Sequence, residues 1–139
     1  MSKLSAIQNK AIEEYWSNSE ELKKNLLYRE WELLNAHNET DSNIGGGKSN
    51  RISDTTGNKA IILAEDKNYQ HLKNIITTLE QFYQELDSDQ KTIVDMRYFD
   101  KKECYEWQNI ADKLYMSTYR VLRKRNALID ETARRLGWI

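Results

Sequence analysis

Apolar side chains recur every three or four positions through most of the 139 residues. This spacing places them on one face of an α-helix. A first helix is predicted over residues 3–16, with an apolar stripe of Leu4, Ile7, Ala11 and Tyr15. The polar run Ser17-Asn18-Ser19 then offers capping side chains for a second helix near residues 20–37. Its buried stripe is predicted to be Leu22, Leu26, Trp31, Leu33 and Leu34, with Glu20 and Glu21 in the first turn.

The longest predicted helix covers about residues 56–86 and begins after Asp54 or Thr55. One set of apolar positions alternates steps of three and four: Leu72, Ile75, Leu79, Phe82 and Leu86. A second set repeats every seven residues: Tyr69, Ile76 and Tyr83. A stripe this wide suits the core of a helical bundle. It equally suits a homo-oligomer that pairs two chains through residues 69–86. The pattern leaves both open.

Between these helices, residues 38–56 are rich in Gly, Ser, Asn and Asp and are predicted to form a loop. Gly47-Lys48-Ser49 suggests a phosphate-binding loop, but that motif also needs a glycine five residues before Gly47, where Ser42 stands. We therefore discard a nucleotide site. A basic loop that contacts a DNA backbone or minor groove through Lys48 and Arg51 is one reading. A solvated connector is the other.

The second half of the chain predicts shorter helices. Asp87 or Ser88 can start a helix over residues 89–99, whose apolar residues are Ile93, Val94, Met96 and Tyr98. A polar turn at Asp100-Lys101-Lys102 follows. The chain is therefore predicted to be all-α. Its expected division is a helical N-terminal region, 1–86, and a C-terminal domain, 87–139.

Residues 107–126 have the pattern of a helix-turn-helix, two short helices joined by a tight turn. The predicted first helix buries Trp107, Ile110, Ala111 and Leu114, and the small Ala111 lies where the two helices approach most closely. Met116 fills the turn, Ser117 caps the second helix, and Val121 returns to the core.

Two positions depart from this pattern. Tyr115 occupies the turn position that usually holds a glycine. Lys124 occupies an apolar site, so Leu122, Leu128 and Ile129 are expected to anchor the second helix. That helix is predicted to continue to about Leu136 and to stop at Gly137, with Trp138 folded back onto the bundle.

Charge is unevenly distributed, although the net charge is only −1. Residues 91–139 carry 11 basic and 7 acidic side chains, whereas residues 61–90 carry 2 basic and 6 acidic. A basic face beside a helix-turn-helix is the footprint of phosphate neutralisation. The alternative is an ordinary helical hairpin with a basic solvated face. The predicted DNA-contacting residues are Ser117, Thr118, Tyr119, Arg120, Arg123, Lys124, Arg125, Lys101, Lys102, Lys48 and Arg51.

Composition excludes several other classes. No run approaches the roughly 18 apolar residues of a membrane span, and the N-terminus lacks the apolar core of a signal peptide. The single cysteine, Cys104, precludes an intramolecular disulfide, as expected in a reducing cytoplasm. One cysteine and two histidines do not favour a zinc site. The sequence contains no catalytic triad and no paired carboxylates, so we expect neither an enzyme nor a cofactor.

Residues 86–128 resemble the fourth conserved region of bacterial sigma factors. The resemblance rests on LDSDQKTIVDMRYF, which ends in Arg97-Tyr98-Phe99, and on EWQNIADKLYMS with the basic helix after it. The whole chain resembles small phage transcriptional regulators of the RinA and ArpU type, through GGGKSNRISDTTGNKAI, Ser117-Thr118-Tyr119-Arg120 and Arg123-Lys124-Arg125. The resemblance implies an activator of phage late genes that binds double-stranded DNA and contacts bacterial RNA polymerase.

Three functional hypotheses follow. The first is a sequence-specific transcriptional regulator. The second is a DNA-recognition protein of phage packaging, similar to a small terminase subunit, which would assemble into a ring. The third is a helical adaptor that binds protein through residues 72–86 and has no salt-dependent affinity for DNA.

Overall fold

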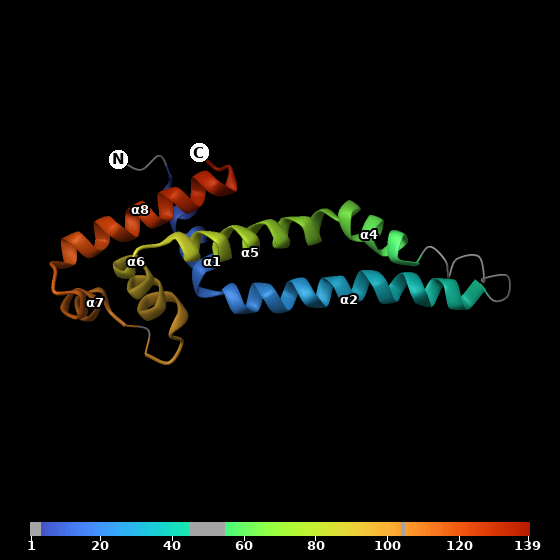
Figure 1. The fold of residues 1–139 in the computed structure, drawn as a ribbon, viewed down its shortest axis with the longest axis horizontal. Coiled ribbons are helices and arrows are strands. Elements are labelled where there is room, and N and C mark those ends of the chain that lie inside the picture. Colours follow the sequence, from blue (N-terminus) through green and yellow to red (C-terminus); the bar gives the residue numbers. More distant parts are fainter. Residues whose placement is uncertain (1–3, 45–54, 104) are drawn as a thin grey trace. The chain divides into compact units, whose positions relative to one another are not determined.

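The computed structural model describes residues 4–44, 55–103 and 105–139, and the side chains of residues 4–35, 57–103 and 105–139. In these ranges every regular element is a helix, which confirms the predicted all-α class (Figure 1). The elements are α1 (Ala6–Ser17), α2 (Ser19–Ile44), α4 (Thr55–Glu65), α5 (Lys67–Glu85), α6 (Ser88–Ile93), the π-helix η1 (Val94–Phe99), α7 (Trp107–Leu114) and α8 (Thr118–Leu136).

The chain forms two compact units, and their boundaries differ from the expected division at residue 86. One unit combines Met1–Ser19 with Ile75–Ile139, and the other is Glu20–Asn74. In the first unit α1 packs against η1 and α8, while α6 packs against α7 and α8. The first helix of the chain is therefore part of the same core as the helix-turn-helix.

The side chain of Trp16 joins α1 to this core. It is 1% exposed, and its ring centroid lies 6.3 Å from those of Phe82 and Phe99. Its indole N–H donates a 3.2 Å hydrogen bond to Thr132 Oγ1, and the Thr132 hydroxyl donates in turn to the Leu128 carbonyl. A buried polar group costs little when it is hydrogen-bonded, so the indole and hydroxyl are both accommodated in the core.

The predicted apolar stripe of α1 is wrong in part. Leu4 is buried as expected, but Ile7 is 82% exposed. The fully buried positions of the helix are instead Ile12 and Trp16, four residues apart. The sequence offers two apolar stripes at helical spacing, and only the packing against α8 and η1 selects between them. Ser5 caps the helix, with its hydroxyl accepting from the Gln8 N–H.

The C-terminus behaves as the sequence predicts. Gly137 adopts a left-handed conformation with φ of 84°, which ends α8. Trp138 folds back so that its ring meets Tyr15 edge to face at 6.0 Å. Near the same end of the helix, the Arg135 guanidinium donates bidentate hydrogen bonds of 2.7 and 2.9 Å to the Glu85 carboxylate, which join α8 to α5. These hydrogen bonds lower the pKa of Glu85 below its ordinary value.

Most of α2 belongs to the second unit. The helix starts at Ser19 with Glu20 and Glu21 in its first turn, as predicted. It runs to Ile44, beyond the expected end at residue 37, so the start of the predicted loop at residue 38 is wrong. Lys48 and Arg51 lie outside the described residues, as does Cys104.

The predicted helix over residues 56–86 is two helices, α4 and α5, with a break at Asp66. The Asp66 carboxylate caps α5 by accepting the Tyr69 N–H at 2.7 Å. It also accepts two hydrogen bonds from the guanidinium of Arg29 on α2, at 2.8 and 3.1 Å. The Arg29 hydrogen bond, followed by that from the backbone, lowers the pKa of Asp66. The chain breaks here without a proline or glycine, because the Asp66 carboxylate accepts the Tyr69 N–H at the start of α5.

The second unit has few buried apolar side chains. Among its described side chains, Tyr69 is the one buried hydrophobic residue. The predicted stripe of α2 is half-buried at its four leucines, whereas Trp31 is 58% exposed, so the prediction that Trp31 is buried is wrong. On α5, by contrast, Ile75, Ile76, Leu79 and Phe82 are buried in the first unit, which agrees with the first of the two alternatives that the pattern left open.

Candidate nucleic-acid interface

The helix leading into the motif, α6, is capped by Asp87, whose carboxylate accepts the Gln90 N–H at 2.7 Å. It continues through Ile93 and Val94, both fully buried, and widens into the π-helix η1. This wider turn closes where the Asp100 N–H donates to the Asp95 carbonyl, five residues back. The predicted helix over 89–99 and its apolar residues are thus confirmed, with a π-helical end that the sequence pattern did not indicate.

The polar turn that follows is also confirmed. One carboxylate oxygen of Asp100 accepts the N–H groups of Lys102 and Glu103, at 3.1 and 3.0 Å. An aspartate that accepts from the following backbone stabilises a turn, because it replaces the main-chain hydrogen bonds that the chain loses there.

The helix-turn-helix is present at the predicted residues. Ile110 and Ala111 of α7 and Val121 of α8 form a buried cluster with Ile93. Met96, Tyr105, Trp107, Leu114 and Met116 pack against this cluster. Ala111 is 1% exposed where α7 and α8 meet, and Met116 fills the turn, as the sequence predicts.

Tyr115 adopts the left-handed conformation that the motif requires, with φ of 56° and ψ of 43°. Its side chain is 96% exposed, so no packing compensates for this conformation. The turn is closed by the Met116 N–H, which donates to the Ala111 carbonyl at 3.1 Å. The geometry of a glycine-type turn is therefore kept with a tyrosine, at a local energetic cost.

We expect Tyr115→Gly to stabilise the protein by about 0.5–1 kcal/mol. A non-glycine residue loses roughly 1–2 kcal/mol in the left-handed region, and the greater freedom of glycine in the unfolded chain offsets part of the gain. Urea unfolding monitored by circular dichroism measures the difference. The matched control is Tyr119→Gly, in a right-handed helix, which should destabilise by about 0.5 kcal/mol. Destabilisation by both variants would contradict strain at Tyr115.

Ser117 caps α8 as predicted, with its hydroxyl accepting the Arg120 N–H at 3.2 Å. Three predicted contact residues project from the first turns of this helix. Tyr119 is 69% exposed, Arg120 is exposed, and the exposed Arg123 guanidinium lies 5.9 Å above the Tyr119 ring. An aromatic ring and two guanidinium groups thus occupy one exposed face at the start of α8.

Three other predicted contact residues are engaged within the fold. Lys124 forms a 3.6 Å ion pair with Asp89 of α6, and Arg125 forms one of 3.5 Å with Glu13 of α1. Lys101 donates to the Ser17 carbonyl at the end of α1. These contacts hold α8 and the polar turn against α1 and α6. Lys102 is exposed.

Glu13 is the centre of this set. It accepts a 2.7 Å hydrogen bond from the buried hydroxyl of Tyr98 as well as the ion pair from Arg125. Burial, then the hydrogen bond to Glu13, raises the pKa of Tyr98, so the hydroxyl stays protonated and donates. The Arg125 guanidinium also lies 5.2 Å from the Trp107 ring, with Arg97 at 4.7 Å from the same ring. These cation–π contacts position the start of α7.

Gln108 is a site residue that the sequence pattern did not reveal. Its amide oxygen accepts a 3.0 Å hydrogen bond from the Thr118 hydroxyl, and its amide nitrogen donates to Asp112 at 3.0 Å. The side chain of Thr118, a predicted DNA contact, is therefore held against α7. The only sequence signal was the four-residue spacing of Gln108 and Asp112 on the polar face of a helix.

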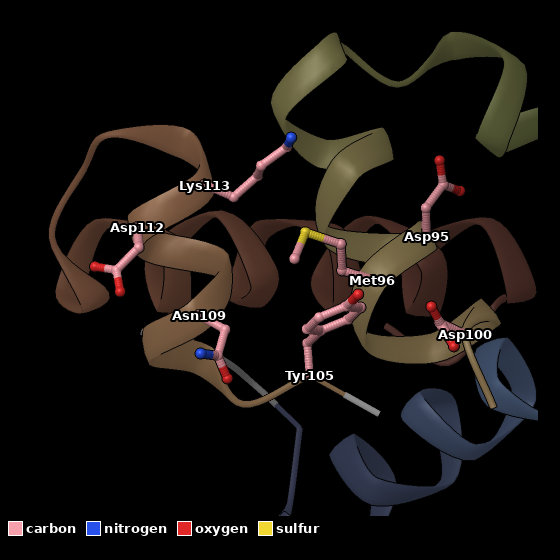
Figure 2. Close-up of a pocket in the computed structure, with 7 residues that line it drawn as sticks. All are labelled: Asp95, Met96, Asp100, Tyr105, Asn109, Asp112 and Lys113. Atoms are coloured by element: carbon pink, nitrogen blue, oxygen red, sulfur yellow. The ribbon is translucent and has the colours of Figure 1, made fainter. Parts of the chain in front are cut away.

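A pocket of about 620 Å³ lies beside the motif, lined by Asp95, Met96, Asp100, Tyr105, Asn109, Asp112 and Lys113. Met96 and Tyr105 lie at its centre, between the α7 residues on one side and Asp95 and Asp100 on the other (Figure 2). Each of its carboxylates already accepts a hydrogen bond within the fold, Asp95 from the Tyr83 hydroxyl at 2.8 Å. These hydrogen bonds give each of the three carboxylates a structural role within the fold.

Among the residues that the structure describes, no three His, Cys, Asp or Glu side chains are grouped so as to hold a metal ion. In the same ranges, none of the helices combines the length and apolar character needed to cross a bilayer.

Comparisons with known proteins place the chain in a family. Neither the curated proteins nor the solved structures contain a significant match. A family model described as "Protein of unknown function (DUF722)" matches residues 6–134, a span that includes both α1 and the helix-turn-helix. The chain belongs to the DUF722 family.

Proposed function

We propose that the protein is a sequence-specific DNA-binding transcriptional regulator. The observation that carries this proposal is the exposed face at the start of α8, where Tyr119, Arg120 and Arg123 project from a helix that follows a tight left-handed turn. In helix-turn-helix proteins the N-terminal turns of this second helix enter the major groove. Guanidinium groups match the paired acceptors of guanine, and an exposed aromatic ring can contact a thymine methyl group.

The contacts within the fold narrow the proposed interface. Lys124 and Arg125 are paired with Asp89 and Glu13, and Lys101 binds the Ser17 carbonyl. The Thr118 hydroxyl is likewise bonded to Gln108. We therefore assign the direct contacts to Tyr119, Arg120 and Arg123, and a phosphate contact to Lys102. A charge already paired within the protein gains less from a phosphate, because its existing partner must be released.

The resemblance to sigma factors and to RinA and ArpU regulators extends the proposal. In that extension the protein activates phage late genes, which encode packaging and virion proteins, by contacting bacterial RNA polymerase at a promoter. A pull-down of purified polymerase on promoter DNA tests this step separately, because DNA binding without polymerase recruitment would leave a DNA reader that does not activate.

The test of the proposed function is selection from a pool of random duplexes at two salt concentrations, followed by sequencing. We expect an enriched motif whose affinity falls steeply with salt, since each neutralised phosphate releases counterions. Enrichment of sites upstream of late genes supports the activator. Enrichment of a packaging site, together with a ring-sized mass in solution, supports the terminase-like alternative. Unenriched or salt-independent binding overturns DNA recognition and favours a helical adaptor.

A further inference from the structure

The unit Glu20–Asn74 has an exposed apolar surface on α2. Three large residues on α2 are well exposed, Leu27 at 64%, Tyr28 at 60% and Trp31 at 58%. The Tyr28 and Trp31 rings stack with centroids 6.0 Å apart. Exposed clusters of this kind on a soluble protein mark interaction sites.

This surface lies opposite the side of α2 that faces the rest of its unit. Arg29 marks the inner side, because its guanidinium binds Asp66 at the α4–α5 junction. At 100° per residue, Leu22, Leu26 and Leu33 share the side of Arg29, and these leucines are half-buried. The opposite side of the helix is lined by Glu20, Lys24, Leu27, Tyr28, Trp31 and Asn35, which we name the outer face of α2.

The described side chains of this unit include too few buried apolar residues to form a stable hydrophobic core by themselves. Tyr69 is the one buried hydrophobic residue among its described side chains. Helices of this kind are stabilised mainly by tertiary packing of an apolar face, and small units commonly need oligomerisation to complete a core. The outer face is therefore expected to be covered in the assembled protein.

The residues of the outer face are complementary to themselves when two copies run antiparallel. With the centre between Leu27 and Tyr28, Leu27 of each copy meets Tyr28 of the other. Lys24 then meets the Trp31 ring of the second copy, a cation–π arrangement, and Glu20 meets Asn35. A parallel pairing would instead place Lys24 against Lys24 and Glu20 against Glu20. Like charges in contact disfavour that orientation.

We propose that a second copy of this chain covers the outer face of α2, so that the protein is an antiparallel homodimer through residues 20–35. The interface is isologous, because the same surface serves both copies. It differs from the pairing through residues 69–86 that the sequence suggested, since the apolar side chains of α5 from Ile75 onward are buried within the first unit. The proposal is independent of DNA binding.

The first test measures the mass of the full-length protein without DNA, by light scattering after gel filtration. We expect about 33 kDa, twice the 16.5 kDa of one chain. Tyr28→Glu combined with Trp31→Glu should give a monomer. The matched control is Ile7→Glu, at an exposed apolar residue of α1, which should leave the dimer intact. A monomeric wild type, a larger assembly, or equal dissociation by the control would overturn the proposal.

A second test does not depend on the folding of the doubly charged variant. Glu20→Cys and Asn35→Cys are each made in a Cys104→Ser background, with a size tag on one of the two chains. A short thiol cross-linker should join Glu20→Cys to Asn35→Cys at least tenfold more efficiently than either variant to itself. Efficient cross-linking of Glu20→Cys to itself would overturn the antiparallel arrangement, and no cross-linking in any combination would overturn the interface.

Discussion

Replacing Trp16 by alanine is expected to destabilise the protein by about 3–5 kcal/mol. The side chain is 1% exposed, packs between Phe82 and Phe99, and donates a hydrogen bond to Thr132. Its removal leaves a cavity where α1, α5 and α8 contribute to one core. Because domains are stable by only about 5–15 kcal/mol, this loss is a large fraction of the total. Guanidinium unfolding monitored by circular dichroism measures it.

Two controls separate the contributions to this effect. Ile7→Ala, at an 82% exposed position of the same helix, should change the stability by no more than about 0.5 kcal/mol. Trp16→Phe keeps most of the apolar volume but removes the hydrogen bond to Thr132. The Thr132 hydroxyl keeps its bond to the Leu128 carbonyl, so this variant should lie between the other two. Equal effects of Trp16→Ala and Ile7→Ala would contradict the placement of α1 in the core.

The packing of α1 also affects the proposed DNA-binding face. α1 contributes Trp16 to the core, Glu13 to the pair with Arg125 and Tyr98, and the Ser17 carbonyl to the bond with Lys101. Each of these contacts joins the N-terminal helix to an element of the helix-turn-helix half. Loss of α1 is therefore expected to weaken DNA binding indirectly, by releasing α8, although none of its residues needs to touch DNA.

Arg120→Ala is expected to weaken binding to the selected DNA site by about 1–3 kcal/mol and to relax the preference at one base position. Arg120 is exposed in the first turn of α8, where a guanidinium can read the two acceptors of guanine. Fluorescence anisotropy with the selected duplex and with a scrambled duplex measures the effect. A loss confined to the selected duplex identifies base readout, whereas equal losses on both would remove Arg120 from that role.

Two variants serve as controls for this measurement. Arg134→Ala lies in the last turn of the same helix, where the arginine pairs with Glu131, and it should leave both affinities unchanged. Lys102→Ala is expected to lower affinity for both duplexes alike and to reduce the salt slope by about one, as a phosphate contact does. Together the three variants distinguish reading of the sequence from neutralisation of the backbone.

Interactions between residues close in sequence determined much of the structure of residues 87–139. The cap at Ser117, the small residue at Ala111 and the stop at Gly137 were predicted, and the cap at Asp87 was one of two candidates. Each depends on interactions within a few residues, such as a side chain that accepts a nearby N–H group. Interactions between residues so close along the chain can be recognised in the sequence itself. The same signals therefore also located the candidate interface.

The tertiary structure decided the features that depend on distant parts of the chain. The sequence predicted a stripe on α1 that includes Ile7, whereas contact with Thr132, 116 residues away, buries Trp16. The pattern over residues 56–86 indicated one helix, but Asp66 bonds with Arg29, 37 residues away, where α4 ends and α5 begins. The sequence predicted Lys124 and Arg125 as DNA contacts, whereas the structure pairs them with Asp89 and Glu13. The physical reason is common to all three: periodicity shows which residues can share a face, whereas the partner of that face is set by packing between segments that are far apart in sequence.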